Sequence, residues 1–143
     1  MNDEPYELAA ILATGDPREL YSGLSVLVSV AVDEKPCAAL ASFGALELLL
    51  GDVTGTDKFA RSLAELRDTA LDLQSRAAER GDKFARSLAE LRDTALDLES
   101  LTVWACAASV DTMDVEPGQQ LAGVMSTPRF LRETAGARRF IHV

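Results

Sequence analysis

The chain has 143 residues, of which 48% are hydrophobic and 26% are charged. This composition is typical of one folded domain and excludes a charge-rich disordered chain. The net charge of −9 argues against nucleic acid and against anionic membrane surfaces as partners. No apolar run approaches the roughly 20 residues that span a bilayer. No basic and apolar leader opens the sequence either, so we expect a cytoplasmic protein.

The first third of the chain predicts two strands and two helices. Residues 6–14 form an apolar run of strand length, and Gly15-Asp16-Pro17 then supplies a turn, a helix N-cap and a proline at the first helical position. Residues 37–43 form a second apolar strand, after which we expect a turn at Gly44 and a short helix over residues 45–50. The buried face of the first helix is expected to carry Leu20, Leu24, Leu27 and Ala31.

A perfect repeat dominates the middle of the chain. Residues 57–73 recur without change as residues 82–98, a shift of 25 residues. Solenoid families need about three or more units and tolerate drift, so we interpret this repeat as a tandem duplication of one helix, natural or engineered. In each copy the apolar residues follow a helical period and form one stripe. In the first copy this stripe consists of Phe59, Leu63, Leu66, Ala70 and Leu73.

The repeat raises two questions, namely whether its copies form one helix or two and which copy packs on the sheet. A shift of 25 residues is close to seven helical turns, so one unbroken helix would keep both stripes nearly aligned. Gly81 followed by Asp82, however, has the chemistry of a helix end and a new N-cap, which predicts two helices with a break near Gly81. Because the second copy leads within two residues into a strand at Leu101, we predict that this copy packs on the sheet.

The last third predicts two more strands and two short helices. Residues 101–107 read as a strand, residues 117–124 as a short helix, residues 127–134 as a helix closed by Gly136, and residues 139–143 as the last strand. Strands that alternate with helices indicate the α/β class. We therefore predict one domain over residues 1–143, a three-layer α/β/α sandwich with a mostly parallel sheet of about four to five strands and an extra duplicated helix.

Ligands of such folds bind beyond the carboxyl ends of the strands. Cys106 lies at that end of its strand, whereas Cys37 begins its strand at the opposite edge. Two cysteines and the single His142 are too few for a disulfide framework or a zinc site, so we expect no metal and no cofactor. The residues expected to line a pocket near Cys106 are Thr14, Gly15, Phe43, Gly44, Trp104, Ala107 and Ser109.

The order of these elements, with Thr14-Gly-Asp-Pro17 in the first loop and Val103-Trp-Ala-Cys106-Ala-Ala-Ser109 at the third strand, resembles the DsrE/DsrF-like family. The resemblance covers nearly the whole chain apart from the extra repeat copy. It implies a small α/β protein that assembles as an oligomer. The extra amphipathic helix also adds apolar surface that one small domain cannot cover, so we expect a homo-oligomer, a dimer or a multiple of one. In the sulfur-relay members a cysteine at this place carries a persulfide between partner proteins. The resemblance therefore implies a sulfur-carrier role for Cys106, with sulfur-donor or sulfur-acceptor proteins as partners.

The sequence also departs from the relay pattern. Ala107 follows the cysteine where relay members often have glycine, and no Lys or Arg lies between Leu101 and Pro128, although several carboxylates do. Nearby carboxylates oppose thiolate formation. The alternative is therefore a non-catalytic oligomeric binding or structural module, or an engineered helix-duplication variant, in which Cys106 is packing. Reaction with an alkylating agent in the native state would separate the two readings.

Overall fold

The structure is a computed structural model that describes residues 5–51, 72–118 and 120–143. Strands and helices alternate along most of the chain, as the sequence predicts. In chain order the elements are β1 (Leu8–Leu12), α1 (Pro17–Ala31), β2 (Cys37–Ala41), α2 (Phe43–Leu50), α4 (Asp72–Asp97), β3 (Leu101–Cys106), α5 (Ala107–Met113), β4 (Val124–Met125), α6 (Thr127–Glu133) and β5 (Arg139–His142).

The strands form one five-stranded sheet in the order β4-β3-β2-β1-β5, and every pair is parallel. The predicted α/β class and parallel sheet are therefore confirmed. Leu8 pairs with Cys37, and Cys37 with Leu101, so the three central strands begin in register and end together. Their carboxyl ends meet at one edge of the sheet, where α2 and α5 leave β2 and β3.

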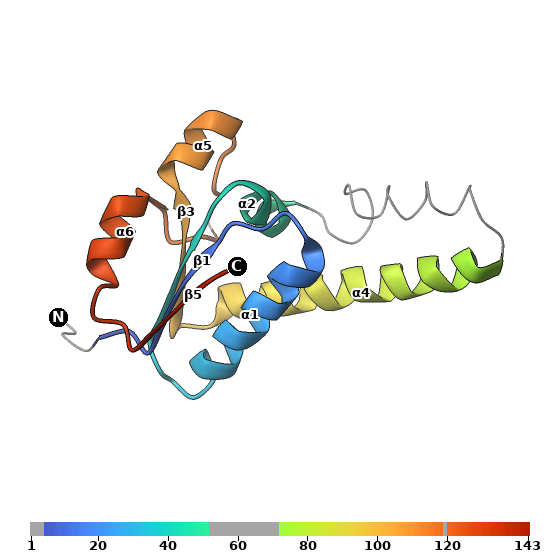
Figure 1. The fold of residues 1–143 in the computed structure, drawn as a ribbon, viewed down its shortest axis with the longest axis horizontal. Coiled ribbons are helices and arrows are strands. Elements are labelled where there is room, and N and C mark those ends of the chain that lie inside the picture. The colour runs from blue at the N-terminus through green and yellow to red at the C-terminus, as the bar shows by residue number, and fades with distance from the viewer. Residues whose placement is uncertain (1–4, 52–71, 119) are drawn as a thin grey trace.

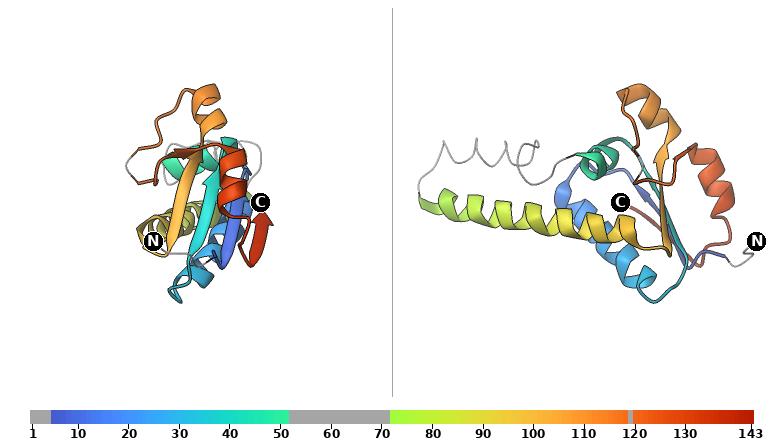
Figure 2. Two further views of the ribbon diagram at one scale, coloured as in Figure 1. Left: turned by 90° about the vertical axis from the view of Figure 1, so that its left-hand side faces the viewer. Right: turned by 180° about the vertical axis from the view of Figure 1, so that it is seen from behind.

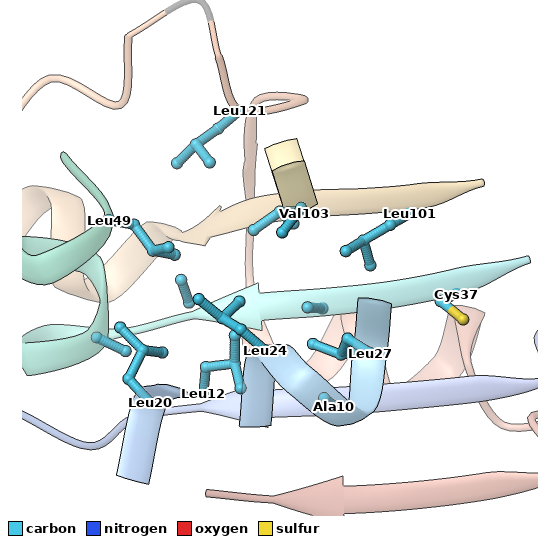
Figure 3. Packing of buried hydrophobic residues seen from close by; sticks show 14 of the residues in the cluster. Ala10, Leu12, Leu20, Leu24, Leu27, Cys37, Leu49, Leu101, Val103 and Leu121 are labelled. Atoms are coloured by element: carbon cyan, nitrogen blue, oxygen red, sulfur yellow. The ribbon is translucent and has the colours of Figure 1, made fainter. Parts of the chain in front are cut away.

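Helices cover both faces of the sheet, which gives the three predicted layers. α1 and α4 lie on one face and α6 on the other (Figures 1 and 2). The larger core lies on the α1 and α4 side, where Leu20, Leu24 and Leu27 of α1 point at the strands (Figure 3). The smaller core on the α6 side is built around Phe130, which is 0% exposed.

The central strand β2 consists of small residues, Cys-Ala-Ala-Leu-Ala, all of them buried. Alternate residues point to opposite faces, so Ala38 belongs to the smaller core and Ala39 to the larger one. Because alanine fills little space, long side chains of the helices occupy the volume above the strand. This explains why leucines concentrate on the inner face of α1.

α1 begins as the sequence predicts. Asp16 is the N-cap, its carboxylate accepts a hydrogen bond from the Arg18 amide at 2.8 Å, and Pro17 occupies the first turn. The four predicted core positions, Leu20, Leu24, Leu27 and Ala31, are all buried. The helix ends at Ala31 with Val32 as its C-cap.

The predicted break near Gly81 is wrong. α4 is one helix of 26 residues from Asp72 to Asp97, and Gly81 lies inside it. A glycine in a helix interior costs only about 1 kcal/mol relative to alanine. The neighbouring Ala77, Ala78, Glu79 and Arg80 are good helix formers. The amino-terminal part of α4 extends beyond α1 and the sheet (Figures 1 and 2).

The second repeat copy packs on the core, as predicted. Leu88 and Ala95 of its stripe are 2% and 0% exposed, and Phe84, Leu91 and Leu98 pack against the same cluster. Arg92 adds a polar contact, since its guanidinium donates to the Gly51 carbonyl at 2.6 Å. The first copy lies outside the described residues except for its last two, Asp72 and Leu73, whose backbone forms the start of α4.

Three further predictions are corrected by the structure. Residues 117–124 do not form a helix in their described part, because Gly118 and Gly123 adopt φ of 71° and 139°. Gly44 is not a turn but the second residue of α2, which begins at Phe43. Gly136 does not cap α6, whose C-cap is Thr134. α5 and the two-residue strand β4 had not been predicted, since neither has the length or the periodicity that marks an element.

Candidate functional site

The loops after β1, β2 and β3 come together at the carboxyl end of the sheet. The Ser42 amide donates to the Leu12 carbonyl at 2.9 Å, which joins the first two loops. The Phe43 amide donates to the Ser109 hydroxyl at 3.1 Å, which joins the second and third. The three loops therefore lie together at this edge of the sheet.

The first loop satisfies its own polar groups. The Thr14 hydroxyl donates to Glu19 at 2.8 Å and accepts from the Asp16 amide at 3.0 Å, while Asp16 caps α1. The amides of Asp16 and Arg18 are thus already engaged within the loop. The Thr14 hydroxyl therefore closes the turn and already makes two hydrogen bonds.

Gly44 and Gly15 are in backbone contact. A Cβ on Gly44 would lie 2.4 Å from Gly15 Cα and 2.7 Å from the Gly15 nitrogen. Only a residue without a side chain fits there, so the two glycines bring the first two loops together instead of opening a cavity between them. A hollow lined by Val32, Glu34 and Glu99 lies at the opposite, amino-terminal end of the sheet.

Phe43 is strained and exposed. Its φ is 45°, in the left-handed region where a bulky residue is rare, and its side chain is 51% exposed. Such a conformation costs about 1–3 kcal/mol and persists only where the surroundings hold it. The hydrogen bond from the Phe43 amide to the Ser109 hydroxyl is one such restraint. Strain of this kind concentrates at functional sites. Here the strained residue follows β2, and the neighbouring strand β3 ends at Cys106.

Cys106 ends β3 and is the N-cap of α5. It is 4% exposed and shares the smaller core with Met125 and Phe130. Its sulfur lies 3.6 Å from the Thr127 hydroxyl at the start of α6. Burial by itself raises the pKa of the Cys106 thiol, but hydrogen bonds from the amides of Ser109 and Ala108 and from the hydroxyls of Thr127 and Ser109 outweigh it. The pKa of Cys106 is therefore lowered, which favours the thiolate.

Cys37 has the opposite character. It begins β2, is 0% exposed and lies inside the larger core beneath α1 (Figure 3). Burial is the largest effect on the pKa of the Cys37 thiol and raises it. A hydrogen bond with the Leu8 backbone lowers this pKa by a smaller amount, and the Glu7 carboxylate raises it further. Its thiol donates to the Lys35 carbonyl at 3.4 Å. The two cysteines therefore lie at opposite ends of the sheet, with opposite pKa shifts.

The remaining predicted pocket residues have separate places. Ser109 is 0% exposed, and its hydroxyl accepts a hydrogen bond from the Phe43 amide. Ala107 is the half-buried first residue of α5. Trp104 instead packs edge-on against Phe130, with ring centroids 6.4 Å apart, so it is part of the smaller core.

Thr127 was missed by sequence reasoning. It reaches Cys106 only because β4 pairs with β3 and sets Met125 beside Cys106. β4 has only two residues, which is too short for an alternating hydrophobic pattern to predict it.

Within the described residues, no group of three or more His, Cys, Asp and Glu side chains could hold a metal ion. Nor is any helix in these ranges both long and apolar enough to cross a membrane. The fold and the site together define an α/β protein with a parallel sheet and, at the carboxyl end of that sheet, a buried cysteine whose pKa is lowered. No protein-family model matches the chain, and no curated protein matches it.

Proposed function

We propose that the chain is a DsrE/DsrF-like sulfur carrier that holds sulfur as a persulfide on Cys106. The observation that supports this most is the place of Cys106 at the carboxyl end of the central strands, where the Thr127 hydroxyl lies 3.6 Å from its sulfur and the pKa of the thiol is lowered. The absence of lysine and arginine from residues 101–127 does not prevent this, since hydrogen bonds supply the stabilisation that cations would give.

The chemistry is a pair of thiol exchanges without net oxidation. The Cys106 thiolate attacks the outer sulfur of a donor persulfide, R–S–SH. The donor S–S bond breaks, the donor thiolate leaves, and Cys106 becomes Cys106–S–SH. An acceptor thiolate then attacks the outer sulfur and releases the Cys106 thiolate. A low pKa helps both steps, because it raises the thiolate fraction and makes Cys106 a better leaving group.

Access to Cys106 is controlled by α6. This helix has seven residues and carries Thr127 at its start and the anchoring Phe130 in its middle. With Cys106 only 4% exposed, a donor must displace this cover or reach past Thr127. A short helix held by one large side chain can open locally at modest cost.

Sulfur loading tests the proposal directly. The intact protein is incubated with a small organic persulfide and its mass is measured. We expect a gain of one sulfur atom in the wild type and in Cys37→Ser, and none in Cys106→Ser. Loading that survives in Cys106→Ser, or never occurs in the wild type, would contradict the proposal.

Native-state alkylation gives a second and independent test. Cys106 should react with iodoacetamide in the folded protein, whereas Cys37 should react only after denaturation, because it is 0% exposed and its pKa is raised. Peptide mapping identifies the modified residue. Equal protection of both cysteines would remove the sulfur-carrier reading.

A second candidate function is a non-catalytic oligomeric module. The low exposure of Cys106 favours it, as do exposed apolar side chains on α6 and the edge strand β5, Leu131 at 46% and Phe140 at 45%. An apolar edge strand is a template for association. A homo-oligomer with an unreactive Cys106 would favour this module, whereas a homo-oligomer that loads sulfur would favour the carrier.

A further inference from the structure

We infer that β5 is a docking edge, to which an acidic, extended segment of a partner protein adds as a further strand. The inference does not depend on the thiol chemistry of Cys106. It rests on the open backbone of β5, on the exposed side chain of Phe140 and on the arginines nearby. Among the described residues β5 pairs only with β1, so its other side is an edge of the sheet.

The backbone of β5 presents hydrogen-bonding groups at this edge. The Val143 amide donates to the Ile11 carbonyl at 2.9 Å, and the Val143 carbonyl accepts from the Ala13 amide at 2.9 Å, so Val143 faces β1. Successive residues of a strand direct their N–H and C=O groups to opposite sides. Phe140 and His142 therefore direct theirs away from β1. Such a row of groups is a template for another strand.

Phe140 offers an apolar contact beside the open backbone. It pairs with Ala9, which belongs to the smaller core, and paired residues of neighbouring strands point to the same face. Phe140 therefore lies on the α6 side of the sheet. Seen from that side, α6 does not lie over β5 (Figure 2, left), and the Phe140 side chain is 45% exposed. An added strand would remove part of this ring from water, which stabilises the complex.

Arginines give this region a charge opposite to that of the whole chain. Residues 127–143 contain four arginines and one glutamate, whereas the chain has a net charge of −9. Arg138 lies 3.5 Å from the Glu7 carboxylate. Arg132 is exposed on α6, on the same side of the sheet as Phe140. Arg139 is exposed on the other face, since it pairs with Leu8 of the larger core. Both faces of the edge therefore carry positive charge.

Charge decides which strand fits the edge. Two copies of this chain paired through β5 would bring their arginines together, and like charges destabilise a strand pair. An acidic strand would be attracted instead. If its carboxylates alternate with apolar side chains, the carboxylates lie beside Arg139 on one face and the apolar side chains contact Phe140 on the other. The partner that fits is therefore a segment of alternating acidic and apolar residues.

A fluorescent peptide of alternating glutamate and valine tests the inference on the intact protein. A peptide of alternating lysine and valine, equal in length, is its control. We expect the acidic peptide to raise its fluorescence anisotropy on binding and the basic peptide to remain free. Equal binding of the two peptides, or no binding of the acidic one, would overturn the inference.

Matched variants locate the binding surface. Arg139→Glu should weaken binding of the acidic peptide about ten-fold, because it replaces an attraction by a repulsion. Arg86→Glu, at an exposed position of α4, should leave the affinity unchanged. Phe140→Ala should weaken binding about five-fold. Val26→Ala should not, although Val26 is 46% exposed on α1. Equal affinities within either pair would overturn the inference.

Hydrogen exchange distinguishes an added strand from a loose ionic contact. At a peptide concentration about ten times its Kd, exchange of the Phe140 and His142 amides should slow about ten-fold. The amides of Ile141 and Val143 face β1 and should change little. Peptide binding without protection of Phe140 and His142 would overturn strand addition. Protection of these amides in the free protein that is lost on dilution would show a second copy at the edge, and would overturn the acidic partner.

Discussion

Replacement of Gly44 by alanine should destabilise the protein, whereas the same replacement at Gly81 should stabilise it. Both glycines lie in helices, α2 and α4, where alanine is intrinsically better by about 1 kcal/mol. At Gly44 a steric contact opposes this preference. At Gly44 the new Cβ would lie 2.4 Å from Gly15 Cα, a contact that real Cβ atoms do not make.

The magnitude follows from the kind of atom that must move. The neighbour of Gly44 is backbone, which cannot rotate away as the end of a side chain would. Overpacking of this sort costs about 1–3 kcal/mol, and we place Gly44→Ala at the upper end. After the gain in helix propensity, the net loss is about 2 kcal/mol. For a chain of this size that lowers Tm by about 8 °C, whereas Gly81→Ala should raise it by about 4 °C.

Thermal melts followed by circular dichroism check both values on one scale. A Gly44→Ala variant that melts at or above the wild-type temperature would refute the backbone contact between the first two loops. A Gly81→Ala variant that melts lower would show that Gly81 has a left-handed φ. That result would reinstate the two-helix prediction.

Further predictions concern the core, the repeat, the thiols and the assembly. Leu91→Asp should lower Tm by far more than Leu66→Asp, because Leu91 packs against the larger core. The reverse order in thermal melts would show the copies exchanged. Deletion of residues 57–81 should leave a folded domain with cooperative unfolding. Phe130→Ala should cost about 3–4 kcal/mol in denaturant titrations and speed alkylation of Cys106, since α6 loses its anchor. The raised pKa of Cys37 contributes stability that is complete below the pKa of the thiol in the unfolded chain, about 8.5. This contribution is lost as the pH rises through the pKa of the thiol in the folded protein. Cys37→Ala should therefore weaken the decline in stability at alkaline pH. Light scattering at micromolar concentration should give a dimer or a multiple, and a monomeric mass would contradict the proposed oligomer.

The sequence predicted the parts of the fold that local patterns encode. Asp16 and Pro17 predict the start of α1, and the helical spacing of the leucines after them predicts its buried face. The apolar runs that became β1, β2 and β3 gave the parallel sheet and placed the two cysteines at opposite ends. Each of these signals lies within a few residues of the feature that it predicts.

What sequence reasoning missed depends on contacts between distant segments. Thr127 meets Cys106 across 21 residues, through a strand of two residues that no pattern marks. Gly44 looked like a turn because its partner, Gly15, lies in another loop. The break near Gly81 was predicted from one local signal, a glycine before an aspartate, and the helix formers on either side outweighed it.

The continuity of α4 has a consequence for variation in chain length. Its carboxyl-terminal residues are held on the sheet by Leu88 and Ala95, while its amino-terminal part extends beyond the core. Insertion or loss of a single residue near Gly81 would leave the held part in place and rotate the preceding turns by about 100°. Gain or loss of a whole repeat would rotate them by only about 20°. Small insertions and deletions here would therefore redirect the outward face of the helix without touching the core, and natural selection could act on that direction independently of stability.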